Sequence, residues 1–503
     1  MPDVSQESPL TMEQMLQTIR TGLPKTLVPK NITVVGAGIS GLVTASLLKE
    51  AGHNVTILEA NNRVGGRIFT NRSSFYSGQY VELGAMRIPS IHLLVLEYIK
   101  KFNLPIEEFI NSTPNDIIYV NGVRTIQSIY EEDPDILEFP TALNEKGKTA
   151  DALAKYAMEP ITSFIEKNPK QNWDIIIKEF DRYSMEYYLK YNPFGRRLSV
   201  GAIDMIKVML GLEGFPELSF TALLREVMIL FTEGLKFYEI KGGNDHLPAS
   251  FLPQLSENLY FNQKMRRIEQ IDSHVTIHTV DTKTSQRYTT TSDLAIITIP
   301  FSLLNFVEVT PHDLFSYNKY KAIRQLHYVA STKIALQFRT RFWEKEGFVG
   351  GKMISDLPVR YAYFPSQSVG TESPGVLLAS YTWEDNATLW DSLTEQEKIA
   401  DSLENLAYIY GPKIYDEYLT GTSFSWAENP FSGGAFAIFK PDQQTEIAPY
   451  IQTPQGSIHF AGDHTSTTPG WIQGAIESGI RVAYEVNDLP KLSDSHETEN
   501  EAK

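Results

Sequence analysis

The sequence predicts a mixed α/β fold, in which one parallel-sheet domain is interrupted by a β-rich insertion and a helical insertion. Three observations support this prediction. Residues 32–58 have the pattern of a strand, a glycine turn, a helix and a second strand, which is the unit that begins a parallel sheet. Residues 131–236 lose strand patterns and show long helical ones. Residues 322–430 are mostly β in pattern, and residues 458–487 return to strand, glycine turn and helix.

The first glycine turn carries the clearest chemical signal. Ile32–Val35 is predicted to be a buried strand, and Gly36-Ala37-Gly38-Ile39-Ser40-Gly41 then opens a helix. Glycines permit the tight turn and the close approach of a pyrophosphate, whose charge is favoured by the helix N-terminus. Glu59 follows the second strand, Val55–Leu58, at the spacing needed to bind a ribose hydroxyl. This segment therefore predicts a dinucleotide site.

The remaining elements are predicted from hydrophobic periodicity. A short amphipathic helix is expected within residues 11–29, and it ends near Gly22–Pro24. The later elements are helices at Ala152–Ile165, Trp173–Tyr188 and 472–487, and strands at Val275–Thr279, Leu294–Ile299 and Ile458–Phe460.

Composition limits the chemistry. The 503 residues carry 45 Lys and Arg against 61 Asp and Glu, a net charge of -16, which argues against a nucleic-acid partner because phosphate binding needs a basic face. There is no cysteine, which excludes disulfides, thiolate catalysis and cysteine-bound metals. With 10 His and no H-E-x-x-H pattern, we expect no metal site.

The ends of the chain suggest where the protein works. Met1–Leu10 lacks a basic head followed by an apolar run, so we expect no signal peptide. The sequence contains no stretch of about eighteen apolar residues, which is the length needed to span a membrane. We therefore expect a cytoplasmic protein, with export by another route left open, and a disordered tail at 488–503.

Two further motifs extend the nucleotide site. Arg63-Val64-Gly65-Gly66-Arg67 follows Glu59 closely. More than 390 residues later, Phe460-Ala461-Gly462-Asp463-His464 follows a strand, and Gly470–Ala475 opens a helix whose N-terminus suits the far, flavin end of a cofactor. Two cofactor segments so far apart imply one nucleotide domain with other domains inserted in it.

These motifs resemble the flavin amine oxidases and, within them, the bacterial-type L-amino-acid oxidases. The resemblance covers residues 11–487 and includes the ordered segments Glu82–Pro89, Lys333–Leu336, Phe342–Glu344, Gly350–Lys352 and Asp356–Pro358. It implies FAD as the cofactor and molecular oxygen as the electron acceptor. The implied reaction converts an L-amino acid to a 2-oxo acid, ammonia and hydrogen peroxide.

The resemblance also implies roles for single residues. Arg87 would bind the substrate carboxylate with its two-pronged guanidinium, and Tyr381 would donate a second hydrogen bond to it. Lys333 would hold a water near flavin N5, Phe436 and Trp471 would flank the amine, and the carbonyl of Gly470 would accept from the amino group. Lys333, Trp471 and Phe436 form the expected catalytic set. Ala435 is an alternative to Phe436, because the alignment there is uncertain by one residue.

The expected cofactor contacts and domains follow from the same reasoning. The residues expected to contact FAD are Gly36, Ala37, Gly38, Ser40, Gly41, Glu59, Ala60, Arg63, Gly66, Arg67, Gly84, Ala85, Met86, Arg87, Met265, Trp426, Gly462, Asp463, Trp471, Ile472 and Ala475. We expect an FAD-binding domain of residues 30–72, 237–321 and 431–487, a substrate-binding domain of 8–29, 73–130 and 322–430, and a helical domain of 131–236. The helical domain is the candidate interface of a homodimer or higher homo-oligomer.

Other interpretations stay open. Arg87 could be a structural ion-pair partner, Lys333 a solvated strand lysine, and Tyr381, Trp426 and Phe436 ordinary core aromatics. The flavin site could instead oxidise a monoamine or polyamine, act as an amino-acid 2-monooxygenase, or bind flavin without turnover. Arg87 argues against the amine substrates, which have no carboxylate to pair with it.

One position departs from the family pattern. Secreted animal members carry a histidine near what is Glu226–Val227 here, together with disulfides and a signal peptide. A catalytic role for that histidine does not transfer to this chain. Arg225 and Glu226 are candidates to shape the entrance in its place.

Overall fold

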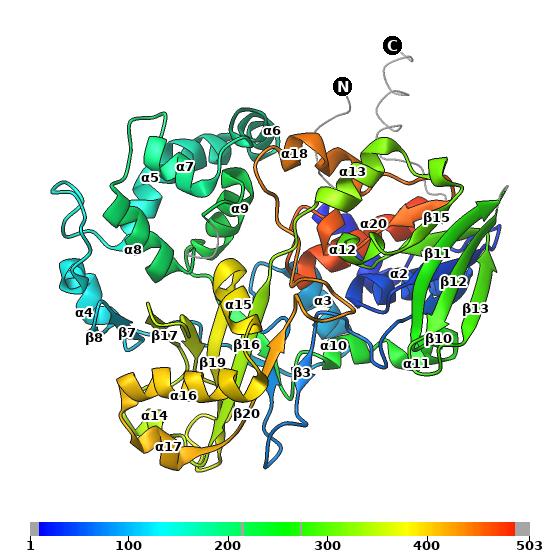
Figure 1. Ribbon diagram of the computed structural model, residues 1–503. Helices are drawn as coiled ribbons and strands as arrows, with labels where there is room; N and C mark the ends of the chain where they lie inside the picture. Colours follow the sequence, from blue (N-terminus) through cyan, green and yellow to red (C-terminus); the bar gives the residue numbers. More distant parts are fainter. Residues whose placement is uncertain (1–9, 213–215, 272–273, 488–503) are drawn as a thin grey trace.

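The computed structural model describes residues 10–212, 216–271 and 274–487, so the predicted tail at 488–503 lies outside the described residues. Figure 1 shows three regions. A parallel sheet with its helices lies on the right, a group of helices lies at the upper left, and a larger sheet with flanking helices lies below. The fold is mixed α/β, as the sequence predicts.

The parallel sheet is built from segments far apart in the sequence. Its order is β10-β2-β1-β14-β21, and each neighbouring pair is parallel. Side chains of β1 are buried from Ile32 to Val35, as expected for a central strand. Its strands are β1 (Asn31–Val35), β2 (Asn54–Leu58), β10 (Leu259–Tyr260), β14 (Leu294–Ile297) and β21 (Ile458–Phe460).

Two helices from opposite ends of the chain pack against this sheet together. They are α2 (Ile39–Ala51) and α20 (Ile472–Val486). They approach closely at Gly479, where an added Cβ would lie 2.7 Å from the carbonyl oxygen of Ser40. An antiparallel sheet extends from the same region, with β11 (Gln263–Ile271), β12 (His274–Asp281), β13 (Arg287–Ser292) and the parallel edge strand β15 (Glu308–Thr310).

The largest sheet has seven strands in the order β20-β16-β19-β18-β17-β7-β8. Its strand β16 is buried at all 8 positions, because it is paired on both edges and covered on both faces. The helix α16 (Glu395–Tyr410) packs against it. The strands are β7 (Ile117–Val120), β8 (Val123–Ile126), β16 (Ser331–Phe338), β17 (Lys352–Ser355), β18 (Tyr361–Tyr363), β19 (Gly375–Trp383) and β20 (Tyr418–Ser425).

The helical region contains α5 (Ala150–Lys167), α6 (Pro169–Phe180), α7 (Met185–Tyr191), α8 (Val200–Leu210) and α9 (Phe220–Leu230). The single helix predicted at Trp173–Tyr188 is wrong, because α6 ends at Phe180 and α7 begins after Ser184. The Asp181 carboxylate accepts hydrogen bonds from Thr445 and Ser219, and Ser184 caps α7. These tertiary and capping bonds stabilise a break that periodicity does not reveal.

Segments that connect the regions pack on the parallel-sheet core. The helices α1 (Met12–Thr21) and α3 (Leu93–Lys101) share a hydrophobic cluster with β1 and β2. Strand β9 (Phe237–Ile240) pairs with β5 (Ile88–Pro89) and β6 (Ile106–Glu108). The domain boundaries expected from the sequence stay a prediction.

Short elements complete the chain. They are β3 (Thr70–Asn71), β4 (Val81–Glu82), α4 (Gln127–Glu132), η1 (Pro134–Leu137), α10 (His246–Ala249), α11 (Leu252–Leu255), η2 (Ser256–Asn258), α12 (Phe301–Leu304), η3 (His312–Leu314), α13 (Tyr317–Gln325), α14 (Phe342–Lys345), α15 (Glu384–Asp391), α17 (Lys413–Glu417), α18 (Gln443–Glu446), α19 (Ala448–Ile451) and η4 (Asp463–Thr465).

Candidate active site

The glycine turn between β1 and α2 is shaped to receive a phosphate group. Gly36 has a φ of +111°, which favours glycine. A Cβ at Gly41 would lie 2.1 Å from the carbonyl oxygen of Gly36, so a side chain there would push the helix away from the turn. A Cβ at Gly38 would meet nothing within 4 Å, and Gly38 lines a cavity. The turn therefore leaves open space at a helix N-terminus, where an anion is favoured.

Glu59 lies at the same end of the sheet. Its carboxylate accepts hydrogen bonds from the backbone amides of Ala37 and Asn61, both at 2.7 Å. Burial raises the pKa of Glu59, and these amides partly oppose that rise. The side chain also borders the cavity, where its remaining lone pairs suit a ribose hydroxyl.

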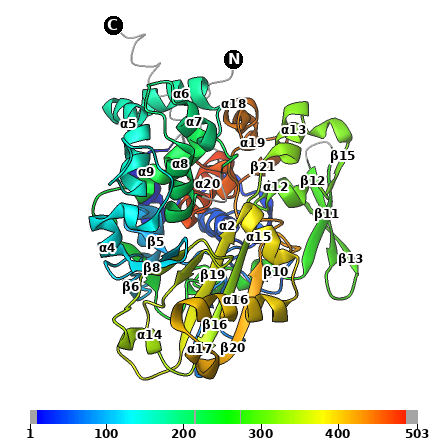
Figure 2. The ribbon, with the colours of Figure 1, turned by 60° about the vertical axis from the view of Figure 1, so that its left-hand side comes forward.

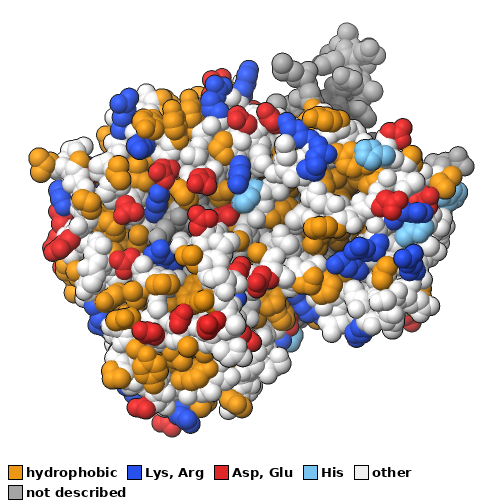
Figure 3. All heavy atoms as spheres, viewed as in Figure 1, with side chains coloured by type: hydrophobic (Ala, Val, Ile, Leu, Met, Phe, Trp, Pro, Cys, Tyr) orange, Lys and Arg blue, Asp and Glu red, His pale blue; other side chains and the backbone are white. Residues whose placement is uncertain are grey.

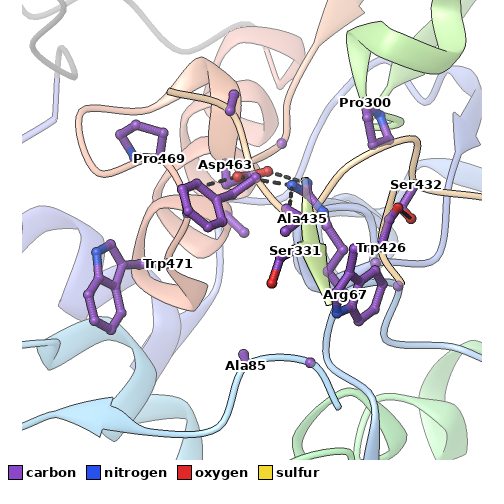
Figure 4. A pocket seen from close by; sticks show the side chains of 18 of the residues that line it. Arg67, Ala85, Pro300, Ser331, Trp426, Ser432, Ala435, Asp463, Pro469 and Trp471 are labelled. Carbon is purple, nitrogen blue, oxygen red and sulfur yellow. Dashed lines mark hydrogen bonds and ion pairs between the residues drawn. The ribbon is translucent and has the colours of Figure 1, made fainter. Parts of the chain in front are cut away.

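A buried ion pair joins the two halves of the nucleotide site. The guanidinium of Arg67 pairs with the carboxylate of Asp463 and donates to the carbonyl oxygen of Ala435 at 3.2 Å (Figure 4). Asp463 also accepts from the amide of Gly470 at 3.0 Å. Burial alone would raise the pKa of Asp463, but the charge of Arg67 holds it below its usual value. Arg63 instead donates to carbonyls of its own loop, including that of Gly66 at 2.7 Å.

One cavity of about 730 Å³ connects these groups. Of the residues expected to bind cofactor or substrate, Ala37 and Gly41 do not line it. Those that line it are Gly36, Gly38, Ser40, Glu59, Ala60, Arg63, Gly66, Arg67, Gly84, Ala85, Met86, Arg87, Met265, Lys333, Tyr381, Trp426, Phe436, Gly462, Asp463, Gly470, Trp471, Ile472 and Ala475.

Arg87 presents a charge to this cavity. Its guanidinium donates to the side-chain oxygen of Asn111 and, at 3.4 Å, to the hydroxyl of Tyr363. The rings of Phe237 and Tyr363 lie 5.1 and 5.7 Å from it. Among the described residues, no Asp or Glu forms an ion pair with Arg87. Its charge is therefore available to an anion from outside the chain.

Lys333 and Tyr381 face each other across β16 and β19. The side chain of Lys333 is only 1% exposed, and its Nζ donates to the carbonyl oxygens of Glu82 at 3.1 Å and Gly84 at 2.7 Å. Burial lowers the pKa of Lys333 to about 7; the charge of Arg87 adds to this effect and Glu82 opposes it. The backbone carbonyls use two positions around Nζ, which leaves one for a water or ligand: an N–H when the amine is charged and a lone pair when it is neutral.

Aromatic side chains form another part of the wall. The ring of Phe436 packs against Gly470, where an added Cβ would lie 3.2 Å from Phe436 Cδ2. Trp471 is the residue just before α20, and its ring contacts that of His92 with centroids 4.9 Å apart. Trp426 is buried, and its Nε1 donates to the carbonyl oxygen of Leu83 at 2.8 Å. Figure 4 shows Trp426 and Trp471 on opposite sides of the Arg67–Asp463 pair.

Sequence reasoning missed two of these wall residues. Trp383 lies two positions after Tyr381 on β19, and its ring meets Phe436 edge to face with centroids 4.8 Å apart. Strand alternation places it on the same face as Tyr381, which was the available signal. Tyr363 is the second, and it comes from the neighbouring strand β18.

The position that departs from the family pattern also lies in the cavity wall. Trp471 Nε1 donates to Glu226 Oε2 at 2.7 Å. Arg225 lines the cavity as well, with its guanidinium 4.3 Å from the ring centroid of Trp173. Figure 1 shows α9, which carries both residues, on the side of the helical region that faces the parallel sheet, and Figure 2 shows α5 to α9 grouped in one region.

Dinucleotides bind beyond the carboxyl ends of parallel strands in folds of this type. The cavity begins there, with the open space at Gly38 and the carboxylate of Glu59, and continues to the N-terminus of α20. The residues fit an extended dinucleotide, for which Glu59 would bind a ribose and the N-terminus of α20 would lie at the far end. The fold and the site define an FAD-dependent oxidoreductase.

Comparison with known proteins agrees with this class. A family model described as flavin containing amine oxidoreductase matches residues 39–487. The candidate L-amino-acid oxidase YobN of Bacillus subtilis (strain 168) is 51% identical over 481 residues, which cover 96% of this chain and 99% of that protein. The L-amino-acid oxidase of Siganus canaliculatus is 35% identical over 485 residues, covering 96% and 90%.

Solved structures share the fold. Cyclohexylamine oxidase from Brevibacterium oxydans IH-35A superposes with a TM-score of 0.75 at 19% identity, covering 92% of this chain and 99% of that one. Putrescine oxidase bound to putrescine gives a TM-score of 0.73 at 20% identity, covering 91% and 99%. The chain belongs to the flavin-containing amine oxidoreductases.

Two features are absent from the described residues. No group of three or more His, Asp and Glu is placed to hold a metal ion. No helix there combines the length and hydrophobicity needed to cross a bilayer.

Proposed function

We propose that this enzyme oxidises L-amino acids at the amine-bearing carbon, with oxygen as the acceptor. The observation that carries the proposal is the guanidinium of Arg87. It lies in the cavity wall beside aromatic rings, and no carboxylate of the described chain pairs with it. A substrate carboxylate would supply the missing partner, whereas a simple amine would leave the charge uncompensated. The named activity of the relatives YobN and the Siganus canaliculatus enzyme supports the same substrate class.

The chain's own residues suit the binding of an amino acid. Arg87 and the hydroxyl of Tyr381 would hold the carboxylate and so fix the hand of the substrate. The carbonyl of Gly470 would accept from the amine, and the rings of Phe436 and Trp471 would exclude water around it. FAD, when bound, supplies the hydride acceptor. The remaining position of Lys333 Nζ, whether an N–H or a lone pair, would hold a water at the same wall.

The products test the proposal. Turnover of an L-amino acid should give a 2-oxo acid, ammonia and hydrogen peroxide in equal amounts. A carboxamide with loss of carbon dioxide would instead identify a 2-monooxygenase. Activity confined to amines that lack a carboxylate would contradict the assignment.

Arg87 itself is tested by substitution. We expect Arg87→Ala to lower kcat/KM for amino acids at least about 100-fold, because a buried charge pair with the substrate is lost. The exposed Arg182, in the turn between α6 and α7, gives the control variant Arg182→Ala. An unchanged kcat/KM in Arg87→Ala would rule out the carboxylate clamp.

We also propose a cytoplasmic location and a homo-oligomer formed through the helical region. Cell fractionation tests the location. Exposed aromatic side chains in this region supply apolar surface that a second copy could cover, and they are Tyr156, Tyr187, Tyr191 and Phe194. In Figure 3 hydrophobic side chains gather at the upper left, where Figure 1 places α5 and α7. Light scattering after gel filtration measures the oligomeric state.

A further inference from the structure

Only one of the two oxygens of the Glu226 carboxylate accepts a hydrogen bond from the described residues. Its Oε2 accepts the hydrogen bond from Trp471 Nε1. Its Oε1 has no hydrogen-bond partner among the described residues, and this atom is accessible to solvent. Because Glu226 lines the cavity, this oxygen is open to the cavity.

The other three carboxylates of the described cavity wall have partners. Both oxygens of Glu59 accept from backbone amides. Asp463 pairs with Arg67 and accepts from an amide. Glu428 has a side chain that is 58% exposed and lies 3.9 Å from Lys398 Nζ. Glu226 is thus the carboxylate that this wall leaves for a ligand.

The surroundings of Glu226 favour a cation as its partner. Leu223, Val227 and Leu230 lie on the same helix and line the same cavity, so water hydrates this carboxylate poorly. Burial accordingly raises the pKa of Glu226 to about 7. No Lys or Arg of the described chain forms an ion pair with Glu226; the charge of the neighbouring Arg225 only partly opposes the rise in pKa, and its guanidinium lies over the ring of Trp173. A poorly hydrated carboxylate without an ion-pair partner gains most from a ligand that brings a positive charge.

Within the proposed oxidation of L-amino acids, we propose that Glu226 binds the cationic end of the substrate side chain. The enzyme would then prefer L-amino acids with basic side chains, such as L-lysine. Arg87 and Glu226 would recognise two charges of opposite sign on one substrate. The rings of Trp383 and Tyr361, which line the cavity, would contact the apolar part of such a side chain.

A pair of substrates isolates the terminal charge. L-Norleucine has the carbon chain of L-lysine without the ε-amine, and both share the α-amine and carboxylate. We expect the wild-type enzyme to show a kcat/KM at least about tenfold higher for L-lysine, measured from initial rates of peroxide formation. Glu226→Gln keeps an oxygen that accepts from Trp471 and removes the charge. It should lower the lysine-to-norleucine ratio roughly 10- to 100-fold.

The control is Glu233→Gln, an exposed glutamate just after α9, which should leave the ratio unchanged. A wild-type ratio at or below one would overturn the proposal, and this measurement needs no variant to fold. Equal decreases in kcat/KM for both substrates in Glu226→Gln would also overturn the proposal, because Glu226 would then act on a part of the substrate that L-lysine and L-norleucine share. Turnover of L-norleucine without a preference for L-lysine refutes only this inference. Absence of turnover with every L-amino acid refutes the proposed function as well.

Discussion

The Nζ atom of Lys333 lies 4.5 Å from the ring centroid of Tyr381, and the two residues are partners across adjacent strands. The same lysine donates to the backbone of residues 82 and 84, a few positions before Arg87. Lys333 therefore connects the strand that carries Tyr381 to the segment that carries Arg87. The two groups proposed to bind the substrate carboxylate are held in place by a third that is almost fully buried.

Replacement of Lys333 should affect turnover more than cofactor binding. We expect Lys333→Met, which nearly conserves volume, to lower kcat about 100-fold while FAD stays bound, because the Nζ that would hold a water is lost. Lys319→Met is the matched control, since Lys319 is equally buried but lies outside the cavity and donates to the carbonyl of Ile451. Stopped-flow flavin reduction and the flavin absorbance per protein measure both effects. An unchanged kcat in Lys333→Met would contradict this role.

Two glycines of the first turn should respond in different ways to alanine. Gly38→Ala places a methyl group in open space, so the protein should fold and bind FAD more weakly. Gly41→Ala places its Cβ 2.1 Å from a backbone oxygen, so Tm should fall even without cofactor. Thermal unfolding with and without FAD, together with flavin content, separates the two outcomes. Full flavin content in Gly38→Ala would show that the pyrophosphate does not lie there.

Loss of the buried pair between Arg67 and Asp463 should be costly. Asp463→Asn leaves the mostly buried guanidinium of Arg67 without a counter-charge, and we expect a loss of about 3 kcal/mol in the free energy of unfolding. The exposed pair between Arg72 and Asp245 is the control, and Asp245→Asn should cost at most about 1 kcal/mol. Denaturant unfolding of both variants makes the comparison. Equal and small losses would show that the buried pair does not stabilise the fold.

The pH dependence of stability tests the burial of Glu226. Burial raises its pKa from an ordinary value of 4.5 to about 7, so the folded protein holds a proton that the unfolded chain releases in this range. The contribution of Glu226 to the free energy of unfolding is fully favourable below pH 4.5. Up to about 3 kcal/mol of it is lost as the pH rises to 7. The glutamine in Glu226→Gln does not titrate. The Tm of this variant relative to that of the wild type should therefore rise as the pH increases from 5 to 8. A constant difference in Tm over this range would contradict the shift.

Local patterns in the sequence were enough to predict the nucleotide end of the site. The turn from Gly36 to Gly41 and the strand that ends before Glu59 are determined by neighbouring residues, and the structure places them as expected. The family resemblance then supplied the cofactor, which the comparisons confirm.

Contacts between distant segments could not be predicted in this way. Trp471 and Glu226 are 245 residues apart, and their hydrogen bond depends on how the helical region packs against the parallel-sheet domain. The contact of Trp383 with Phe436 depends on the path of a loop. The break between α6 and α7 depends on Asp181, whose partner Thr445 lies 264 residues away. Periodicity reports which face is buried, not which segment covers it.

Within the proposed function, Arg87 selects substrates that carry a carboxylate. This selection is tested most directly by anaerobic reduction of the bound flavin, measured with each amino acid and its decarboxylated counterpart: L-lysine with cadaverine, and L-norleucine with pentylamine. We predict that the amino acids reduce the flavin at least about 100-fold faster than the amines, and that Arg87→Ala removes most of this difference. Equal rates for acid and amine in the wild-type enzyme, or an undiminished preference in Arg87→Ala, would contradict the account.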